Sequence, residues 1–310
     1  MILLTELYPA IAVGRFCTVF GKTRQAWYYA THARLEQDMT DNLVVNLVKE
    51  VRLEQPLTGT RKLYHLLKLQ LKQHNIKMGR DALFELLDRY GLLLRCRRRK
   101  AVTTNSNHSY YKYPNLIKNM AALEAKNRLW VSDITYLRLT DGFAYLSLVT
   151  DAYSRMIVGY CLWENLSAKG TINALQMALQ QQRPVKGKLI HHSDRGVQYC
   201  CSGYVACLEA SGIRISMSEK GDPYQNAIAE RVNGILKGNW LGHSFASIEQ
   251  ARQALVKAVD VYNQKRPHES LAYLTPDQAH ELTGIIKRTW KNYTKVASRQ
   301  HPDLQVMQQD

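Results

Sequence analysis

The pattern of hydrophobic and polar positions changes near residue 128. Before it, apolar residues recur at helical spacing, as Leu43, Leu47 and Val51 do at intervals of four. After it, short β-branched and aromatic runs alternate with amphipathic segments. The chain is therefore predicted to hold an all-α region followed by an α/β domain.

The all-α region contains two predicted helix-turn-helix units. The first is expected over residues 11–20 and 23–32 with Gly21 between them, and the second over residues 60–73 and 80–90. Such units place their second helix in the DNA major groove, but two helices joined by a short turn are also a common packing unit. Spacing alone leaves DNA recognition and simple packing both open.

The α/β domain is expected to begin with three strands, the first two joined by the turn Thr140-Asp141-Gly142. Asp222 is expected to cap a later helix that Pro223 opens. The expected strands span residues 128–139, 143–150, 156–163, 188–192 and 213–217, and the expected helices span residues 171–182, 202–210, 224–237 and 248–262, with a short one opening at Pro276.

Three carboxylates lie in three different settings. Asp133 is inside a strand, where a carboxylate without a partner is costly, and Asp194 is where a short apolar strand gives way to a turn. Glu230 belongs to a polar stripe on its helix, opposite an apolar one. The polar stripe comprises Asn226, Glu230, Asn233 and Lys237, and the apolar stripe comprises Ile228, Val232 and Ile235.

Two carboxylates on a sheet and one on a facing helix suit Mg²⁺, which prefers oxygen ligands. Two such ions, roughly 3.5–4 Å apart, stabilise the attacking and leaving oxygens of a phosphoryl displacement. Each acid taken alone is as well explained as an edge residue or an ion-pair partner. The joint pattern favours a metal site.

Four phrases of this sequence resemble the insertion-sequence transposases of family three. They are Trp-Val-Ser-Asp-Ile-Thr-Tyr at residues 130–136, His-His-Ser-Asp-Arg-Gly-Val-Gln-Tyr at residues 191–199, Ser216-Met217-Ser218 through Gly221-Asp222 and Asn226-Ala227 to Glu230, and Tyr262-Asn263 with Arg266-Pro267-His268. The resemblance runs from about residue 128 to 280 and is to the open reading frame B subunit, which carries a retroviral-integrase-like core. A weaker resemblance covers the helix-turn-helix segment before it.

The resemblance implies a fold, an activity and a site. The fold is a ribonuclease-H-like mixed five-stranded sheet with flanking helices, preceded by the all-α region. Asp133, Asp194 and Glu230 map onto the family's DDE triad, as catalytic and metal-binding residues for two Mg²⁺ ions, with Mn²⁺ as a substitute. The activity is cleavage at the 3′ end of the element and strand transfer into another DNA.

Charge agrees with a polyanionic partner. The net charge is +16, and residues 1–127 carry 21 Lys and Arg against 10 Asp and Glu, a net +11. The predicted DNA contacts are Arg61, Lys62, Arg80, Arg95, Arg97, Arg98, Arg99, Lys100, Arg195, Asn226, Lys237 and Arg266. An anionic membrane would also attract such a cluster, but the sequence has no apolar run near 18 residues, no signal peptide and no lipidation motif. A bacterial cytoplasmic location, on the nucleoid, is expected.

The expected domains are a helical DNA-binding region at 1–94, a linker at 95–127, the catalytic core at 128–282 and a basic tail at 283–310. The six cysteines lack the spacing of a zinc site or a disulfide framework.

The resemblance implies as partners terminal inverted repeats, target DNA and further copies of the chain on DNA. In the family the active enzyme is often a frameshift fusion with an upstream helix-turn-helix and leucine zipper. This chain begins with Met1 and shows no zipper. It is therefore expected to be the second-frame product, with the upstream-frame subunit as a further partner. Two alternatives stay open: a ribonuclease-H-like nuclease without strand transfer, and a non-catalytic DNA-binding regulator.

Overall fold

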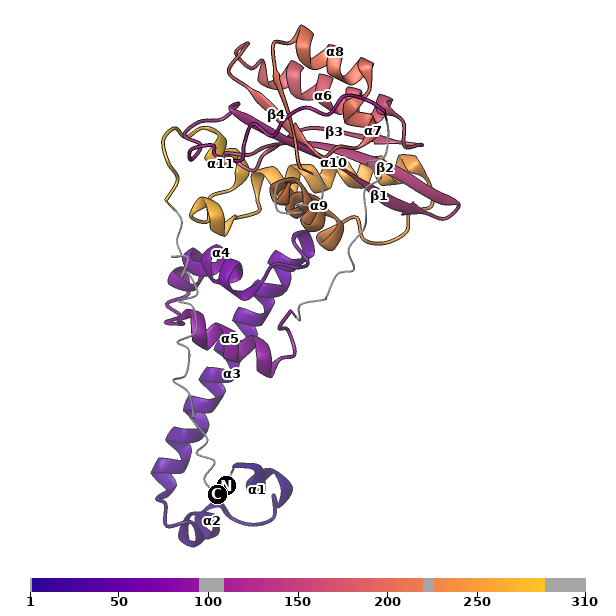
Figure 1. Cartoon of the computed structure of the whole chain (residues 1–310). Helices are drawn as coiled ribbons and strands as arrows, with labels where there is room; N and C mark the ends of the chain where they lie inside the picture. The colour runs from indigo at the N-terminus through magenta and orange to yellow at the C-terminus, as the bar shows by residue number, and fades with distance from the viewer. Residues whose placement is uncertain (1, 95–108, 220–225, 288–310) are drawn as a thin grey trace, which may run out of the picture.

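The structure is a computed structural model that describes residues 2–94, 109–219 and 226–287. The N-terminal part of the chain is helical (Figure 1). It consists of α1 (Ile2–Leu7), α2 (Val13–Val19), α3 (Arg24–Glu54), α4 (Thr60–Gln73) and α5 (Arg80–Arg89). The predicted second helix-turn-helix unit agrees with α4 and α5 to within one residue. The two glycines that precede these helices, Gly59 and Gly79, are their N-caps.

Helix α3 differs from the prediction. The segment expected to end near residue 32 and the packing helix expected around Leu43 form one continuous helix of 31 residues. No glycine or proline interrupts residues 24–54, so nothing in the sequence stops the helix once Thr23 has capped it. The second half of α3 packs on α4 and α5 around Val44, Val48 and Leu67, which makes a small separate core.

A five-stranded sheet with the order β3-β2-β1-β4-β5 forms the centre of the remaining chain. Strands β1 (Leu129–Leu139), β2 (Gly142–Asp151) and β3 (Ile157–Trp163) are an antiparallel meander. Strands β4 (Ile190–Ser193) and β5 (Arg214–Met217) add in parallel to the β1 side. The observed strands match the expected ones to within two residues at each end, and the mixed sheet is confirmed.

Helices cover both faces of the sheet (Figure 1). One face carries α6 (Ala168–Gln182), α7 (Val197–Cys200) and α8 (Ser202–Ala210), and the other carries α9 (Ala227–Asn239) and α10 (Ile248–Gln264). The 3₁₀ turn η1 (Glu269–Leu271) and α11 (Pro276–His280) follow. Thr275 and Gln278 form a capping box on α11, as the proline at its start indicated. The Asp222 and Pro223 proposed for the start of α9 lie outside the described residues, and α9 begins at Ala227.

The helical region contacts the core through the ends of α3 and α4. Lys265 forms an ion pair of 2.7 Å with Glu54, and the indole nitrogen of Trp240 donates to the Glu54 carbonyl at 2.7 Å. Arg61 on α4 pairs with Glu269 at 3.3 Å. Over the described ranges, no helix is long and apolar enough to cross a membrane.

Candidate active site

The sheet brings two of the predicted acids to neighbouring strands. Asp133 lies in β1, opposite Leu148 of β2, and β4 runs parallel to β1 on its other side. Asp194 is the first residue after β4. The parallel register pairs Val131 with His192, so Asp194, two residues further on, comes level with Asp133 in the middle of β1. The charge of Asp194 acts on the Asp133 carboxyl group.

Helix α9 supplies the third acid and lays its polar stripe on β1. The amide nitrogen of Asn226 donates to the Ser132 carbonyl at 3.0 Å, and that of Asn233 donates to Asp133 Oδ2 at 2.8 Å. Lys237 Nζ donates to Thr135 Oγ1 at 3.1 Å and lies 4.1 Å from the centre of the Tyr136 ring. Asn226, Asn233 and Lys237 all contact β1. Glu230 shares their helical spacing, so it lies on the same face of α9.

A main-chain contact orients Asp194. Its Oδ1 accepts from the Gly196 nitrogen at 2.9 Å, in the turn that leads into α7. A β-carbon at position 196 would lie only 3.0 Å from the same oxygen. A glycine in this turn thus lets the backbone approach the carboxylate closely.

The charge of Asp194 disfavours the ionised forms of Asp133 and Glu230. Burial first, and then the charge of Asp194, raise the pKa of Asp133 to about 7, while the hydrogen bond from Asn233 opposes the rise. Partial burial and the charge of Asp194 also raise the pKa of Glu230, although much of this side chain is exposed. A cation bound among these carboxylates would favour their ionised forms and so lower the raised pKa values.

The donor set fits a hard divalent ion, because it consists of carboxylate oxygens around a half-buried position. Among residues 2–94, 109–219 and 226–287, no three His, Cys, Asp or Glu side chains already lie close enough to ligate one ion together. The fit therefore rests on the chemistry of the acids and their mutual repulsion.

The two histidines before Asp194 are packed in the core. His191 and His192 are fully buried, and burial lowers the pKa of His191 to about 3. Its Nε2 lies 2.8 Å from Ser132 Oγ and 2.9 Å from Tyr204 Oη. A neutral, buried His191 holds β4 against β1 and α8 and does not reach a substrate.

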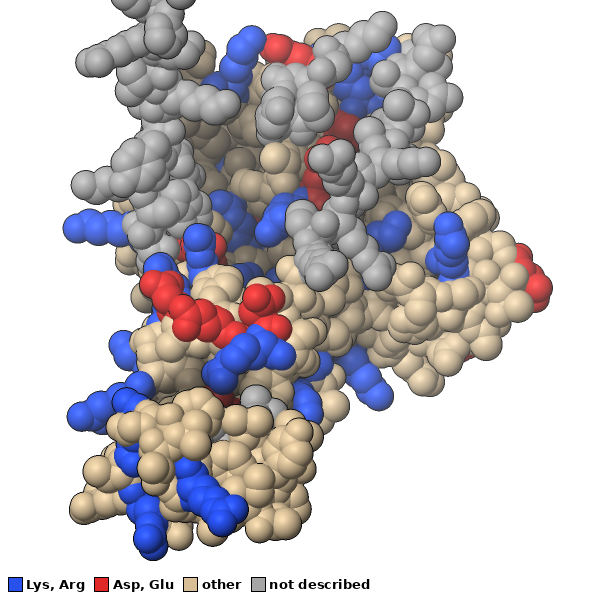
Figure 2. Space-filling view, turned by 90° about the horizontal axis from the view of Figure 1, so that it is seen from below, with Lys and Arg blue, Asp and Glu red and all other residues tan. Residues whose placement is uncertain are grey.

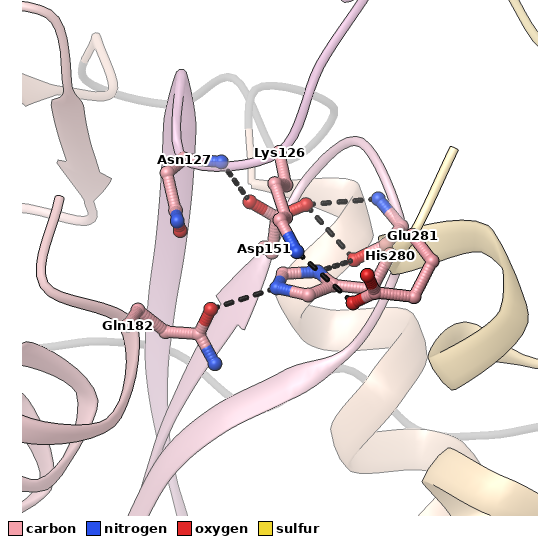
Figure 3. A network of polar contacts seen from close by, with 7 residues as sticks. Lys126, Asn127, Asp151, Gln182, His280 and Glu281 are labelled. Carbon is pink, nitrogen blue, oxygen red and sulfur yellow. Dashed lines mark hydrogen bonds and ion pairs between the residues drawn. The ribbon is translucent and has the colours of Figure 1, made fainter. Parts of the chain in front are cut away.

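Asp151 is a fourth acid near the site, and its contacts are structural (Figure 3). Oδ1 accepts from the nitrogen of Ser154 at 2.9 Å and from its hydroxyl at 3.0 Å, and Oδ2 accepts from the Asn127 nitrogen at 2.8 Å. Ser154 also meets His280 of α11 at 2.8 Å, and His280 reaches Gln182 of α6 at 2.7 Å. This chain of contacts fastens α11 to the sheet.

The predicted DNA contacts are dispersed. Figure 2 shows Lys and Arg side chains spread over the helical region and the core on the face seen from below. Arg61 and Arg80 are exposed and ion-paired with acids, Lys62 and Arg195 are half-buried, and Asn226 and Arg266 are buried. Arg95, Arg97, Arg98, Arg99 and Lys100 lie outside the described residues.

The sequence places Asn233 on the polar stripe with Glu230 but predicts no role for it, and in the structure it donates to Asp133. Its spacing of three from Glu230 was the available signal. His268 stands in the phrase Arg266-Pro267-His268, but no local pattern places Arg231 beside that phrase, as the structure does.

This chain is similar in sequence to known integrase cores and insertion-sequence proteins. Two models described as integrase core domain match residues 124–223 and 211–276. The insertion element IS600 31 kDa protein of Shigella sonnei is 37% identical over 84% of this chain and 95% of its own length. Transposase InsF for insertion sequence IS3A of Escherichia coli K12 is 29% identical over 86% of this chain and 93% of its own length. A solved HTLV-2 integrase catalytic core in complex with magnesium is 18% identical, with a TM-score of 0.40, over 50% of this chain and 97% of that one.

Proposed function

Because this chain belongs to the family-three insertion-sequence transposases, we propose that Asp133, Asp194 and Glu230 are its catalytic triad. Members of this family are DNA polynucleotidyl transferases that move an insertion sequence, and this chain has that function. The observation that supports the triad is the electrostatic action of Asp194 and Glu230 on Asp133, three acids from distant parts of the chain.

The triad would hold two Mg²⁺ ions, with Mn²⁺ as a substitute. Bound there, the ions would activate the attacking oxygen and stabilise the leaving one. Around them, Asn233 keeps the Asp133 carboxylate oriented and favours its ionised form, and Gly196 does the same for Asp194 through its main-chain nitrogen. Lys237 brings a positive charge to the edge of the same surface.

The substrates are proposed to be the terminal inverted repeats of the element and the target DNA. Water would first attack the phosphodiester at the element end and displace its 3′-oxygen, which leaves as a 3′-hydroxyl. That hydroxyl would then attack a phosphodiester of the target and displace the target strand's own 3′-oxygen. Two or more copies of the chain would hold the two ends together, with the upstream-frame subunit as a further partner. Arg61, Arg80, Arg195 and Lys237 are proposed as contacts to the DNA backbone.

The test is strand joining by the purified protein. A labelled duplex carrying one element end is incubated with Mg²⁺ and resolved on a denaturing gel, with Glu230→Gln and, as a matched control, Glu249→Gln at an exposed position on α10. Wild type and Glu249→Gln are expected to nick and join DNA, and Glu230→Gln is expected to do neither. Nicking without joining would support the nuclease. Equal inactivity of all three proteins on DNA that they bind would support the regulator.

A further inference from the structure

A second group of charged side chains lies where α4 meets the core. It comprises Lys62 of α4, Arg231 of α9, and Arg266 and His268 of the segment after α10, with Arg155 of the turn between β2 and β3 beside them. We call these five residues the junction cluster. Arg231 directly follows Glu230 in α9, so the cluster and the triad share one helix but face different directions.

The inner half of the junction cluster is buried and fixed. Arg266 is 5% exposed and His268 is 7% exposed. The Arg266 nitrogen donates to the Val261 carbonyl and the His268 nitrogen donates to the Leu274 carbonyl, both at 3.0 Å. The His268 ring meets the Tyr262 ring edge to face at 5.1 Å. The main-chain bonds hold the backbone at both residues, and the ring contact holds the His268 side chain.

Three buried polar atoms of the cluster lack a hydrogen-bond partner. They are Nε and Nη1 of Arg266 and Nε2 of His268. A buried donor without an acceptor costs about 1–3 kcal/mol, so a guanidinium held this way is expected to have a ligand. Nε and Nη1 lie on different edges of the guanidinium, so each needs an acceptor oxygen of its own, and an oxyanion such as phosphate offers several.

The positive charges of the junction cluster favour an anion that carries several oxygens or more than one negative charge. Burial, Arg266 and Arg231 lower the pKa of Lys62 to about 7, and burial and Arg231 lower that of Arg266 to about 10. The one acid acting on Lys62 in the described part of the chain is Glu269, which is paired with Arg61. The cations therefore repel one another with little compensation from the protein.

We propose that the junction cluster is a phosphate-binding site and that it takes a phosphodiester of the DNA backbone. Lys62 and the exposed Arg231 form the open side and would contact the phosphate oxygens first, and the buried Arg266 behind them would complete the site when its guanidinium turns towards the phosphate. That DNA is the source of the phosphate rests on the proposed function. The DNA would cross from the helical region to the core at the junction cluster. Free inorganic phosphate has the same chemistry and is the other source to be tested.

The first measurement is DNA binding by fluorescence anisotropy in EDTA, over a series of salt concentrations. Lys62→Gln and Arg231→Gln are compared with Lys257→Gln, which removes one exposed charge from α10. The Kd is expected to rise about tenfold for each cluster variant, with a salt slope lower by about one, and to change less than about twofold for the control. Because both residues contact the same phosphate, the double variant is expected to lose less binding free energy for DNA than the sum of the losses of the two single variants.

The second measurement is the Tm in inorganic phosphate against chloride of equal ionic strength. A phosphate-dependent rise in wild type that Lys62→Gln lacks, together with unchanged DNA binding, would overturn DNA as the source. No rise and no change in the DNA salt slope would overturn the site itself. Arg266→Lys serves as a milder change of the buried group, with circular dichroism to check its fold.

Glu230→Gln is expected to bind DNA like wild type in EDTA. A failure of the catalytic proposal would therefore appear only in the gel with Mg²⁺, and a failure of the phosphate site only in the binding slopes.

Discussion

Burial and two neighbouring carboxylates raise the pKa of Asp133 to about 7, against 3.8 for an ordinary aspartate. Between these values the folded state binds more protons than the unfolded state, so the free energy of unfolding falls as the pH rises from about 4 to 7 and then levels off. Without a metal, the site is thus expected to cost stability at neutral and alkaline pH.

Asp133→Asn is expected to stabilise the protein in EDTA, because the amide does not ionise. The gain is expected to be about 2 kcal/mol at pH 8 and to shrink as the pH is lowered towards 5. Thermal melts at several pH values measure it, with Asp141→Asn in an exposed turn as the control. A variant less stable than wild type at pH 8 would contradict the argument.

At the proposed metal site Asn233 would act through Asp133, so its removal is expected to weaken metal binding more than DNA binding. For Asn233→Ala, the Mg²⁺ concentration giving half-maximal nicking is expected to rise about tenfold, with the Kd for DNA in EDTA unchanged. The control is Asn173→Ala, at an exposed position of α6. An equal loss of DNA affinity would assign Asn233 to DNA contact instead.

At the scale of elements, α6 approaches the sheet very closely at Gly159 of β3. A β-carbon there would overlap the Ala174 carbonyl oxygen and lie 2.9 Å from the Ala178 β-carbon. Gly203 of α8 is the opposite case, since the nearest atom to its added carbon would be Ile172 Cδ1 at 3.5 Å. The two glycines offer a matched pair.

Gly159→Ala is expected to destabilise the fold by about 3 kcal/mol, because α6 must move off β3. Gly203→Ala, inside a helix, is expected to be neutral or to stabilise it by up to about 1 kcal/mol. Denaturant unfolding of the two variants measures both values. Similar stabilities for the two would mean that α6 adjusts without cost.

Sequence reasoning reaches those elements whose signals are local. The strand around Asp133, the turn after Asp194 and the stripe on α9 follow from periods of two and three to four residues. The length of α3 was missed because the helix was expected to end near residue 32, although no glycine or proline stands between residues 24 and 54. The burial of Arg266 and the contact of Ser154 with His280 in the Asp151 network could not be predicted from the sequence. They bring together parts of the chain that are more than 100 positions apart.

At the scale of the whole molecule, the helical region and the sheet domain have separate cores. The core around Val44 and Leu67 contains only residues of α3 to α5 and their flanks, and the clusters on the two faces of the sheet contain only residues after 109. Residues 113–123 belong with the sheet domain, because Tyr113, Ile117 and Leu123 pack against it.

A fragment of residues 109–287 is therefore expected to fold without the helical region. It should melt in one cooperative transition with the circular dichroism of a mixed sheet, and it should bind DNA more weakly than the full chain because Lys62 and Arg61 are lost. Melting and anisotropy of the fragment and the full chain test both statements. A fragment without a cooperative transition would show that the docked α3 and α4 are required.

The order of strands in the sheet also sets when its parts can assemble. β1 pairs with β2 across a short turn, whereas β4 reaches β1 only after about sixty intervening residues, as in the pair Val131 and His192. Glu230 comes later still, so short-range pairing precedes long-range closure as the chain leaves the ribosome. An incompletely synthesised chain would hold Asp133 without its two companions, and unfinished protein would be harmless to the DNA that surrounds it.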